Sequence, residues 1–119
     1  MNDFTLGAVE SKFADIIWHN EPLSSSDLAK RAEQELGWKK TTSFTVLKRL
    51  CNKGLFQNEK GTVTSLISRD EFYSKQSERF VEDNFDGSLP AFIAAFTKNK
   101  SLSPEEISEL RRLVDSYKE

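Results

Sequence analysis

The sequence has few of the residues on which catalysis, metal binding and covalent cross-linking depend. Its 119 residues include one cysteine, Cys51, and one histidine, His19. A single cysteine excludes an internal disulfide and a cysteine-rich zinc site, and we expect a reducing, cytoplasmic location. His19 lies at the end of a predicted helix, where a solvated side chain is more common than a catalytic base, and the sequence has no phosphate-binding loop. We therefore expect a protein that is not an enzyme and that binds no metal or cofactor.

Long apolar segments are also missing. No run reaches the roughly 20 apolar residues that span a bilayer, and we expect no membrane insertion. Three acids among the first twenty residues (Asp3, Glu10 and Asp15) argue against a secretory signal. Hydrophobic residues make up 37% and charged residues 30% of the chain, which is typical of soluble globular domains and not of disordered chains. The length fits one domain, or one small domain with an appendage.

The front of the chain predicts three short helices followed by a hairpin. Apolar residues at helical spacing place the helices at residues 6–20, 24–37 and 40–53. We expect Ser24 to be the N-cap of the second helix and Gly54 to be the C-cap of the third. Two short strands, at residues 55–58 and 63–67, flank a Lys60-Gly61 turn. Three helices followed at once by a hairpin are the order of a winged helix-turn-helix.

The rear of the chain is helical throughout. Serine with glutamate three residues later marks two helix starts, Ser68 with Glu71 and Ser103 with Glu106. The predicted helices cover residues 68–85, 89–96 and 103–117. The expected fold is therefore mainly α with a small β-hairpin, consisting of a winged-helix DNA-binding domain at residues 1–68 and a helical dimerisation region at residues 69–119.

The rear helices carry more apolar surface than so short a segment can bury alone. The residues concerned are Phe72, Phe80, Phe85, Leu89, Phe92, Ile93, Phe96, Ile107 and Leu110. They pack either against the front half of the same chain or against a second copy. We expect a homodimer.

Charge is unevenly distributed along the chain. The net charge of −2 divides into +1 for residues 1–68 and −3 for residues 69–119. Between Leu36 and Lys60, six basic residues face one acid, Glu59. A local basic patch is enough to bind phosphates, because salt screens that attraction within about 10 Å. A solvated charged face is the alternative reading of this pattern.

The third helix is the candidate DNA-reading element. A helical wheel places apolar residues on one side and polar and basic residues on the other. Hydroxyls near the start of a helix suit base edges in the major groove, and basic side chains suit phosphates. We predict base-edge contacts from Thr41, Thr42, Phe44 and Thr45. We predict phosphate contacts from Lys39, Lys40, Lys48, Arg49 and, at the hairpin tip, Lys60.

Three other readings stay open. A winged-helix module that binds protein without DNA would share the fold and the dimerisation arm. A DNA-binding regulator with a small-molecule pocket between the phenylalanines of the fourth and fifth helices is another. Cys51 lies on the apolar side of the third helix, where a buried, inert thiol is expected, although an accessible one would allow oxidation beside the DNA face.

Several segments, taken in order, resemble one family. The opening LGAVESKFADIIW (residues 6–18) is similar to the first helix of the penicillinase-repressor and methicillin-resistance-repressor family. GWKKTTSFTVLKRLCNKGLF (37–56) resembles its turn, recognition helix and start of the wing, and LISRDEF (66–72) resembles the exit from the wing. FDGSLPAFIAAF (85–96) and LSPEEISELRRLVD (102–115) are similar to its dimerisation helices. The likeness extends from residue 6 to residue 116.

The resemblance implies a homodimer that represses transcription from a palindromic double-stranded operator, with one winged helix on each half-site. In part of the family a membrane sensor for β-lactams triggers proteolysis within the dimerisation region, which releases the operator. That bond corresponds to Ala95–Phe96 here, where those repressors carry asparagine before the phenylalanine. The copper-responsive branch carries cysteine pairs near its C-terminus, which this sequence lacks. The sequence does not identify a regulatory protease or sensor.

Overall fold

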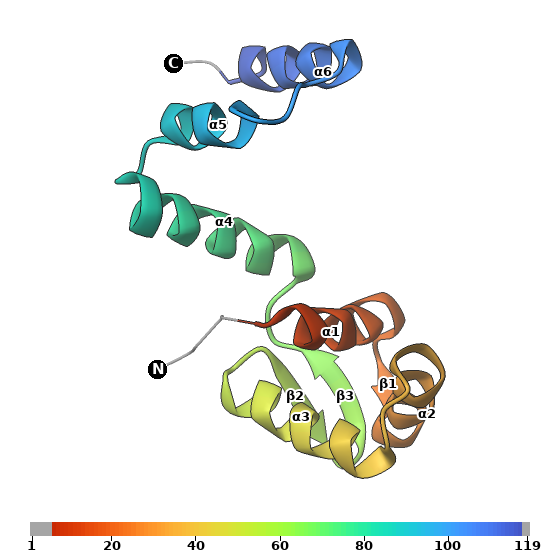
Figure 1. The fold of residues 1–119 in the computed structure, drawn as a ribbon. Coiled ribbons are helices and arrows are strands. Elements are labelled where there is room, and N and C mark those ends of the chain that lie inside the picture. Colours follow the sequence, from red (N-terminus) through yellow and green to blue (C-terminus); the bar gives the residue numbers. More distant parts are fainter. Residues whose placement is uncertain (1–5, 118–119) are drawn as a thin grey trace. The chain divides into compact units, whose positions relative to one another are not determined.

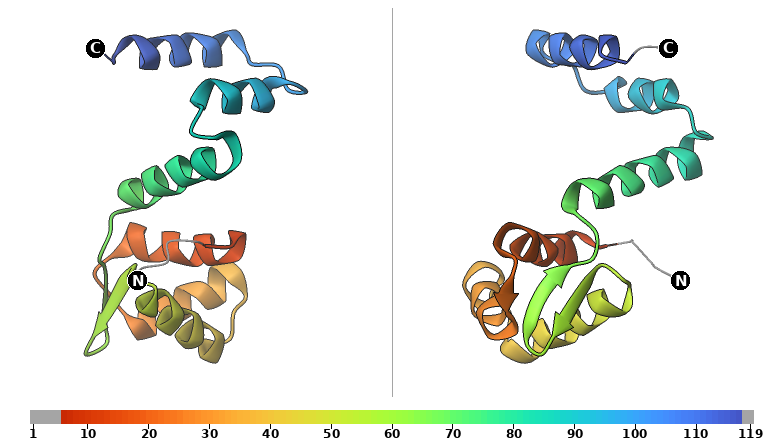
Figure 2. Two further views of the ribbon diagram at one scale, coloured as in Figure 1. Left: turned by 90° about the vertical axis from the view of Figure 1, so that its left-hand side faces the viewer. Right: turned by 180° about the vertical axis from the view of Figure 1, so that it is seen from behind.

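The computed structural model describes residues 6–117, which are mostly helical and include one small sheet (Figures 1 and 2). In chain order the elements are α1 (Ala8–Asn20), β1 (Leu23–Ser24), α2 (Ser25–Leu36), α3 (Lys40–Asn52), β2 (Phe56–Glu59), β3 (Thr62–Ser65), α4 (Arg69–Phe85), α5 (Leu89–Thr97) and α6 (Pro104–Asp115). Each predicted helix is present, and the ends differ from prediction by a few residues. Within this described part, no helix has the combination of length and apolar character needed to cross a bilayer.

Local capping explains where the helices begin and end. The Ser24 hydroxyl accepts the backbone N–H of Asp27 at 3.0 Å, so Ser24 is the predicted N-cap of α2. Gly37 ends α2 with φ of 70°, a left-handed conformation that glycine adopts without strain. The C-cap of α3 is Lys53, and the predicted cap Gly54 is the next residue, with φ of 86°. α3 therefore ends one residue earlier than predicted, and Gly54 is the left-handed residue directly after the cap.

The sheet has three strands, one more than the predicted hairpin. β2 and β3 are antiparallel and join through Lys60 and Gly61, whose φ values of 51° and 86° are both positive, as tight hairpin turns require. The additional strand is β1, which pairs with β3 in the order β1-β3-β2. β1 has only two residues, which are too few for a strand to be predicted from alternating apolar and polar positions. Only its pairing with β3, in which Leu23 faces Val63, makes it a strand.

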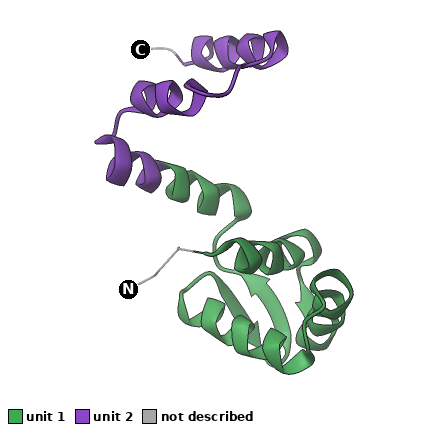
Figure 3. Cartoon of the chain, viewed as in Figure 1, with its two compact units in different colours: residues 1–77 green, residues 78–119 purple. Residues whose placement is uncertain are grey.

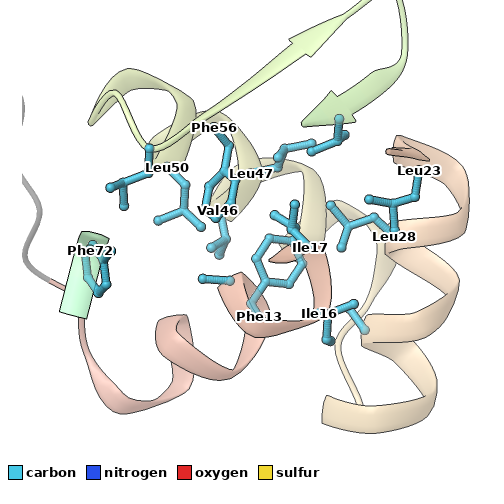
Figure 4. Close-up of a cluster of buried hydrophobic side chains, with 14 residues drawn as sticks. Phe13, Ile16, Ile17, Leu23, Leu28, Val46, Leu47, Leu50, Phe56 and Phe72 are labelled. Carbon is cyan, nitrogen blue, oxygen red and sulfur yellow. The ribbon is translucent and has the colours of Figure 1, made fainter. Parts of the chain in front are cut away.

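The buried core lies between α1, α2, α3, the sheet and the start of α4 (Figure 4). Phe13 and Ile17 of α1 are fully buried, as are Phe56 of β2 and Val63 of β3. Trp18 packs against Phe56 with ring centroids 5.1 Å apart, and its indole Nε1 donates to the carbonyl of Ile67 at 3.0 Å. These contacts hold the first helix, the sheet and the segment after the sheet as one body.

The chain divides into two compact units, residues 1–77 and residues 78–119 (Figure 3). The boundary lies inside α4 and not at residue 68, because the first turns of α4 belong to the core. One predicted dimerisation residue, Phe72, belongs to the core of unit 1 instead. Its side chain is fully buried in unit 1, where its ring lies 5.4 Å from that of Trp18. A side chain with no exposed surface cannot contact a second copy.

Unit 2 contains the end of α4 together with α5 and α6. The rings of Phe80, Phe85 and Phe92 contact one another, with centroids 5.6–6.1 Å apart. Even so, no residue from Glu78 to Tyr117 is buried. Several large apolar side chains are at least one-third exposed: Phe80, Leu89, Phe96, Ile107, Leu110, Leu113, Val114 and Tyr117.

Candidate nucleic-acid interface

The inner face of α3 fixes its position in unit 1. Val46, Leu47 and Leu50 are buried in the core, in agreement with the predicted apolar side of the helix. Just before α3, the Trp38 ring stacks on Phe13 with centroids 5.0 Å apart and planes 26° apart. The inner face of α3 is therefore anchored in the core of unit 1, and the residue before its N-cap is anchored on α1. Its opposite face is left to solvent.

That outer face carries the side chains predicted to contact DNA. Of the predicted residues on α3 and at its N-cap, Phe44 is half-buried. The others are exposed, namely Lys39, Lys40, Thr41, Thr42, Thr45, Lys48 and Arg49. The ammonium of Lys40 lies 5.7 Å from the centroid of the Phe44 ring, within the range of a cation–π contact. The α3 surface is thus a polar face with hydroxyls in its first half and cations at both ends.

The threonines of α3 are not equivalent. The Thr45 hydroxyl donates to the carbonyl of Thr41 at 2.9 Å, within its own helix. Its proton is therefore occupied, while its oxygen lone pairs and its methyl group remain available at the surface. Such a side chain suits an amino donor of a base or a thymine methyl group better than a base acceptor.

An acidic side chain from α1 reaches the C-terminal half of this face. Glu10 Oε2 accepts a hydrogen bond from Arg49 Nη1 at 3.0 Å, and Glu10 Oε1 lies 3.9 Å from Lys53 Nζ. Oε1 also accepts the backbone N–H of Gly7 at 3.2 Å, at the N-cap of α1. Partial burial raises the pKa of Glu10, but the Gly7 N–H and the two cations outweigh it and lower that pKa below 4.5.

Sequence reasoning missed Glu10 because 39 residues separate it from Arg49. Counted along the chain, α3 has no nearby acid, and the patch appears purely cationic. In the folded unit the two cations at the end of α3 share one carboxylate. The available signal was the position of Glu10 in the first turn of α1, although that position indicates capping and gives no tertiary partner.

The hairpin tip holds the remaining predicted contact, Lys60. This side chain is exposed, and the adjacent Gly61 carbonyl accepts the backbone N–H of Ser25 at 2.8 Å. Farther along β3, the Glu21 carboxylate accepts both the N–H and the hydroxyl of Ser65 at 2.8 Å. The hairpin is thereby tied to the α1–α2 segment at two points. We infer that a short hairpin held in this way carries Lys60 at a fixed position relative to α2.

The structure also bears on the other titratable candidates. Cys51 is half-buried, and burial raises the pKa of its thiol, so the unreactive protonated form dominates at neutral pH. The His19 ring bonds through Nδ1 to the carbonyl of Asp15 at 2.8 Å, one turn back in α1. Within residues 6–117, no group of three or more histidine, cysteine or acidic side chains is arranged to hold a metal ion.

Comparison with known proteins places the chain among repressors. It is 24% identical over 116 residues to the methicillin resistance regulatory protein MecI of Staphylococcus aureus (strain Mu50 / ATCC 700699), covering 94% of both chains. It is 27% identical over 113 residues to the penicillinase repressor of Bacillus licheniformis, covering 92% of this chain and 88% of the relative. The solution structure of the DNA binding domain of the repressor BlaI matches with a TM-score of 0.54 and 21% identity, over 60% of this chain and 93% of that one.

The structural match establishes a shared fold for the winged-helix part, and the sequence relatives extend along nearly the whole chain. A family model described as penicillinase repressor matches residues 6–116. This range includes every described element from α1 to α6. The chain belongs to the penicillinase repressor family.

Proposed function

We propose that this protein is a homodimeric transcriptional repressor that binds a palindromic operator through α3, with one winged helix on each half-site. The observation that carries the proposal is the outer face of α3, where exposed threonines and lysines lie opposite a fully anchored inner face. Membership of a repressor family and the fold shared with a repressor's DNA binding domain support it. We assign base contacts to the first half of α3 and phosphate contacts to its lysines and to Lys60.

The anchoring of α3 in the core supports its proposed role in recognising base sequence. A helix that selects base sequence must present its side chains in a fixed geometry, because a misplaced donor loses its hydrogen bond. Buried contacts along the inner face, together with the Trp38–Phe13 stack at its start, provide that rigidity.

Unit 2 supports dimerisation. Its apolar side chains remain at the surface of a single chain, and an exposed apolar surface of this kind is typical of an interface. In a dimer, two winged helices are linked. Once the first has bound one half-site of a palindrome, binding of the second becomes intramolecular and has a high effective concentration. Any event that separates the two copies would therefore lower operator affinity without altering a base contact.

The same logic accounts for derepression by a signal that acts on unit 2. The Ala95–Phe96 bond lies within α5, and both side chains are exposed. A protease that cut there would divide the helix that carries Phe92 and Phe96. We propose loss of the dimer as the step that releases DNA, whichever protease or sensor initiates it.

The test is fluorescence anisotropy of labelled duplex at increasing salt, together with selection of binding sites from a random pool. We expect a steep salt dependence for random duplex and an inverted repeat among the selected sites. Absence of binding even at low salt would reject the proposal that the protein binds DNA. A winged-helix module that binds protein would then be favoured.

Two substitutions test the roles assigned within α3. We expect Thr45→Ala to relax sequence preference, because it removes the hydroxyl and the methyl group proposed to face bases. We expect Lys48→Ala to weaken all duplexes alike and to reduce the slope of log affinity against log salt by about one. The reverse pattern would show that the DNA-facing side of α3 is rotated from the one assigned.

A further inference from the structure

We infer that Glu10 is a positioning residue that restrains Arg49 and Lys53 and thereby limits the affinity of the protein for DNA of random sequence. This inference rests on the proposed binding of DNA through α3. It concerns a residue of α1 that neither the charge pattern of α3 nor its helical wheel reveals.

The geometry places one carboxylate between two cations. Arg49 Nη1 lies 3.0 Å from one carboxylate oxygen of Glu10, and Lys53 Nζ lies 3.9 Å from the other. The Glu10 side chain is 19% exposed, as is that of Lys53, whereas the Arg49 side chain is 54% exposed. Glu10 is therefore held in a shielded position, and the guanidinium extends from it toward solvent.

Glu10 is fixed from its other side as well. The hydrogen bond from the Gly7 N–H orients the carboxylate as part of the N-cap of α1, and the cations of α3 act on the same group. With its pKa lowered from 4.5, the Glu10 carboxyl is ionised at neutral pH. Its negative charge is thus a permanent part of the surface beside the end of α3.

A permanent negative charge at this position has a defined consequence for DNA binding. The three side chains contribute a net charge of +1 where α3 alone would contribute +2. A phosphate that approaches Arg49 must compete with Glu10 for the guanidinium and is repelled by the carboxylate. Since random-sequence binding depends on the number of phosphates neutralised, Glu10 lowers that affinity more than it lowers binding supported by base contacts.

The experiment compares Glu10→Gln with the native chain by anisotropy on random duplex at 50–200 mM salt. Glutamine keeps the shape and can still accept the Gly7 N–H, but it carries no charge. We expect tighter binding to random duplex and a salt slope steeper by up to about one, equivalent to roughly a fourfold larger loss of affinity over this range.

The matched control is Glu71→Gln, which removes a carboxylate from an ion pair elsewhere in unit 1. Glu71 lies in the first turn of α4, and its Oε1 is 3.6 Å from Lys75 Nζ, one turn later in the same helix. Neither residue is among those to which we assign DNA contacts. We expect this control to change the affinity for random duplex much less than Glu10→Gln does.

A double-mutant cycle that combines Glu10→Gln with Arg49→Gln distinguishes two effects of Glu10. One is its restraint of Arg49, and the other is the general effect of its negative charge on DNA binding. If Glu10 acts through Arg49, its removal raises the affinity less when Arg49 is already absent. An equal increase in both backgrounds, or no increase in either, would overturn the inference. If neither the native chain nor any variant binds duplex at low salt, the proposed function itself fails.

A measurement on the native chain covers the case in which Glu10→Gln does not fold, which thermal melts would reveal. In ¹⁵N-labelled protein we expect the Arg49 Nε–Hε resonance to shift as random duplex is added, because the guanidinium exchanges a carboxylate for a phosphate. A resonance that stays unchanged while backbone signals of α3 shift would show that Arg49 does not change partner, and would overturn the inference.

Discussion

The two compact units differ in how they bury their apolar residues. In the described part of the chain every buried hydrophobic residue belongs to unit 1, where α1, α2, α3 and the sheet enclose a common core. Unit 2 has three aromatic rings in mutual contact, yet all of its described residues keep accessible surface. Unit 1 therefore encloses a core of its own, whereas the apolar side chains of unit 2 remain at the surface of a single chain.

The contrast has a geometric origin. In unit 1 the chain returns to itself, because β1 and β3 pair across residues far apart in the sequence and Trp18 bonds to Ile67. In unit 2, the helices follow one another with short connections, and their contacts are between neighbours in sequence. A unit this small buries too little of its own area to enclose its apolar side chains. The exposed face that remains is the proposed dimer interface.

The largest expected effect comes from a pair of phenylalanines on α4 that fall in different units. Phe72→Ala should lower the free energy of unfolding by about 3–5 kcal/mol, because it opens a cavity in the core of unit 1. Phe80→Ala, with the side chain 51% exposed, should lower it much less at a protein concentration where the chain is monomeric. Urea unfolding measures both. Equal losses would remove the distinction between the units.

The next effect concerns the exposed face of unit 2. Phe96→Asp should raise the dissociation constant of the dimer at least about tenfold, since a charge replaces a half-exposed ring that a second copy would cover. Sedimentation equilibrium measures this constant. Asn99→Asp is the control, because it adds the same charge to an exposed polar position nearby. An unchanged dimer in Phe96→Asp would place the interface elsewhere.

A smaller effect is expected inside the core of unit 1. Ser43 is 1% exposed, and its hydroxyl is a buried group without a hydrogen-bond partner in the described structure. Ser43→Ala should therefore stabilise unit 1 by about 1 kcal/mol, because it removes an unsatisfied polar atom at little change of shape. Ser74→Ala, an exposed serine on α4, gives the baseline for helix propensity. A loss of stability in Ser43→Ala would indicate a water or partner at this hydroxyl.

The smallest effect compares two glutamates that occupy the same capping position in different units. Glu10 caps Gly7 and also pairs with α3, whereas Glu106 is held by the backbone N–H and hydroxyl of Ser103, within α6. The pKa of each is lowered from 4.5, so each stabilises the fold above that pH and loses its contribution as pH falls below it.

Glu10→Gln should flatten the acid limb of the unit 1 melting temperature below pH 4.5, and Glu106→Gln should leave that temperature unchanged while reducing helix content by circular dichroism. Thermal melts at successive pH values make the comparison. An equal effect of the two substitutions on the unit 1 melt would contradict the local character of the α6 cap.

Much of the fold follows from local sequence. Ser24, Ser88 and Ser103 each accept the N–H three residues ahead, at the starts of α2, α5 and α6. The inward and outward faces of α3 follow from its periodicity, since a helix of known pitch fixes which residues share a side. Short-range hydrogen bonds and helical spacing depend on a few neighbouring residues, so they can be predicted before any tertiary contact is known.

Tertiary structure decided the features that join distant residues. β1 exists only through its pairing with β3, and Phe72 entered the core of unit 1 although its neighbours on α4 read as a dimerisation helix. Glu10 reaches Arg49 across 39 residues of sequence and changes the charge of the face that α3 presents. Local sequence gives each segment its conformation and its apolar side. Which segment covers that side depends on packing of the whole chain, because hydrophobic contacts are non-directional and accept any apolar surface of matching shape.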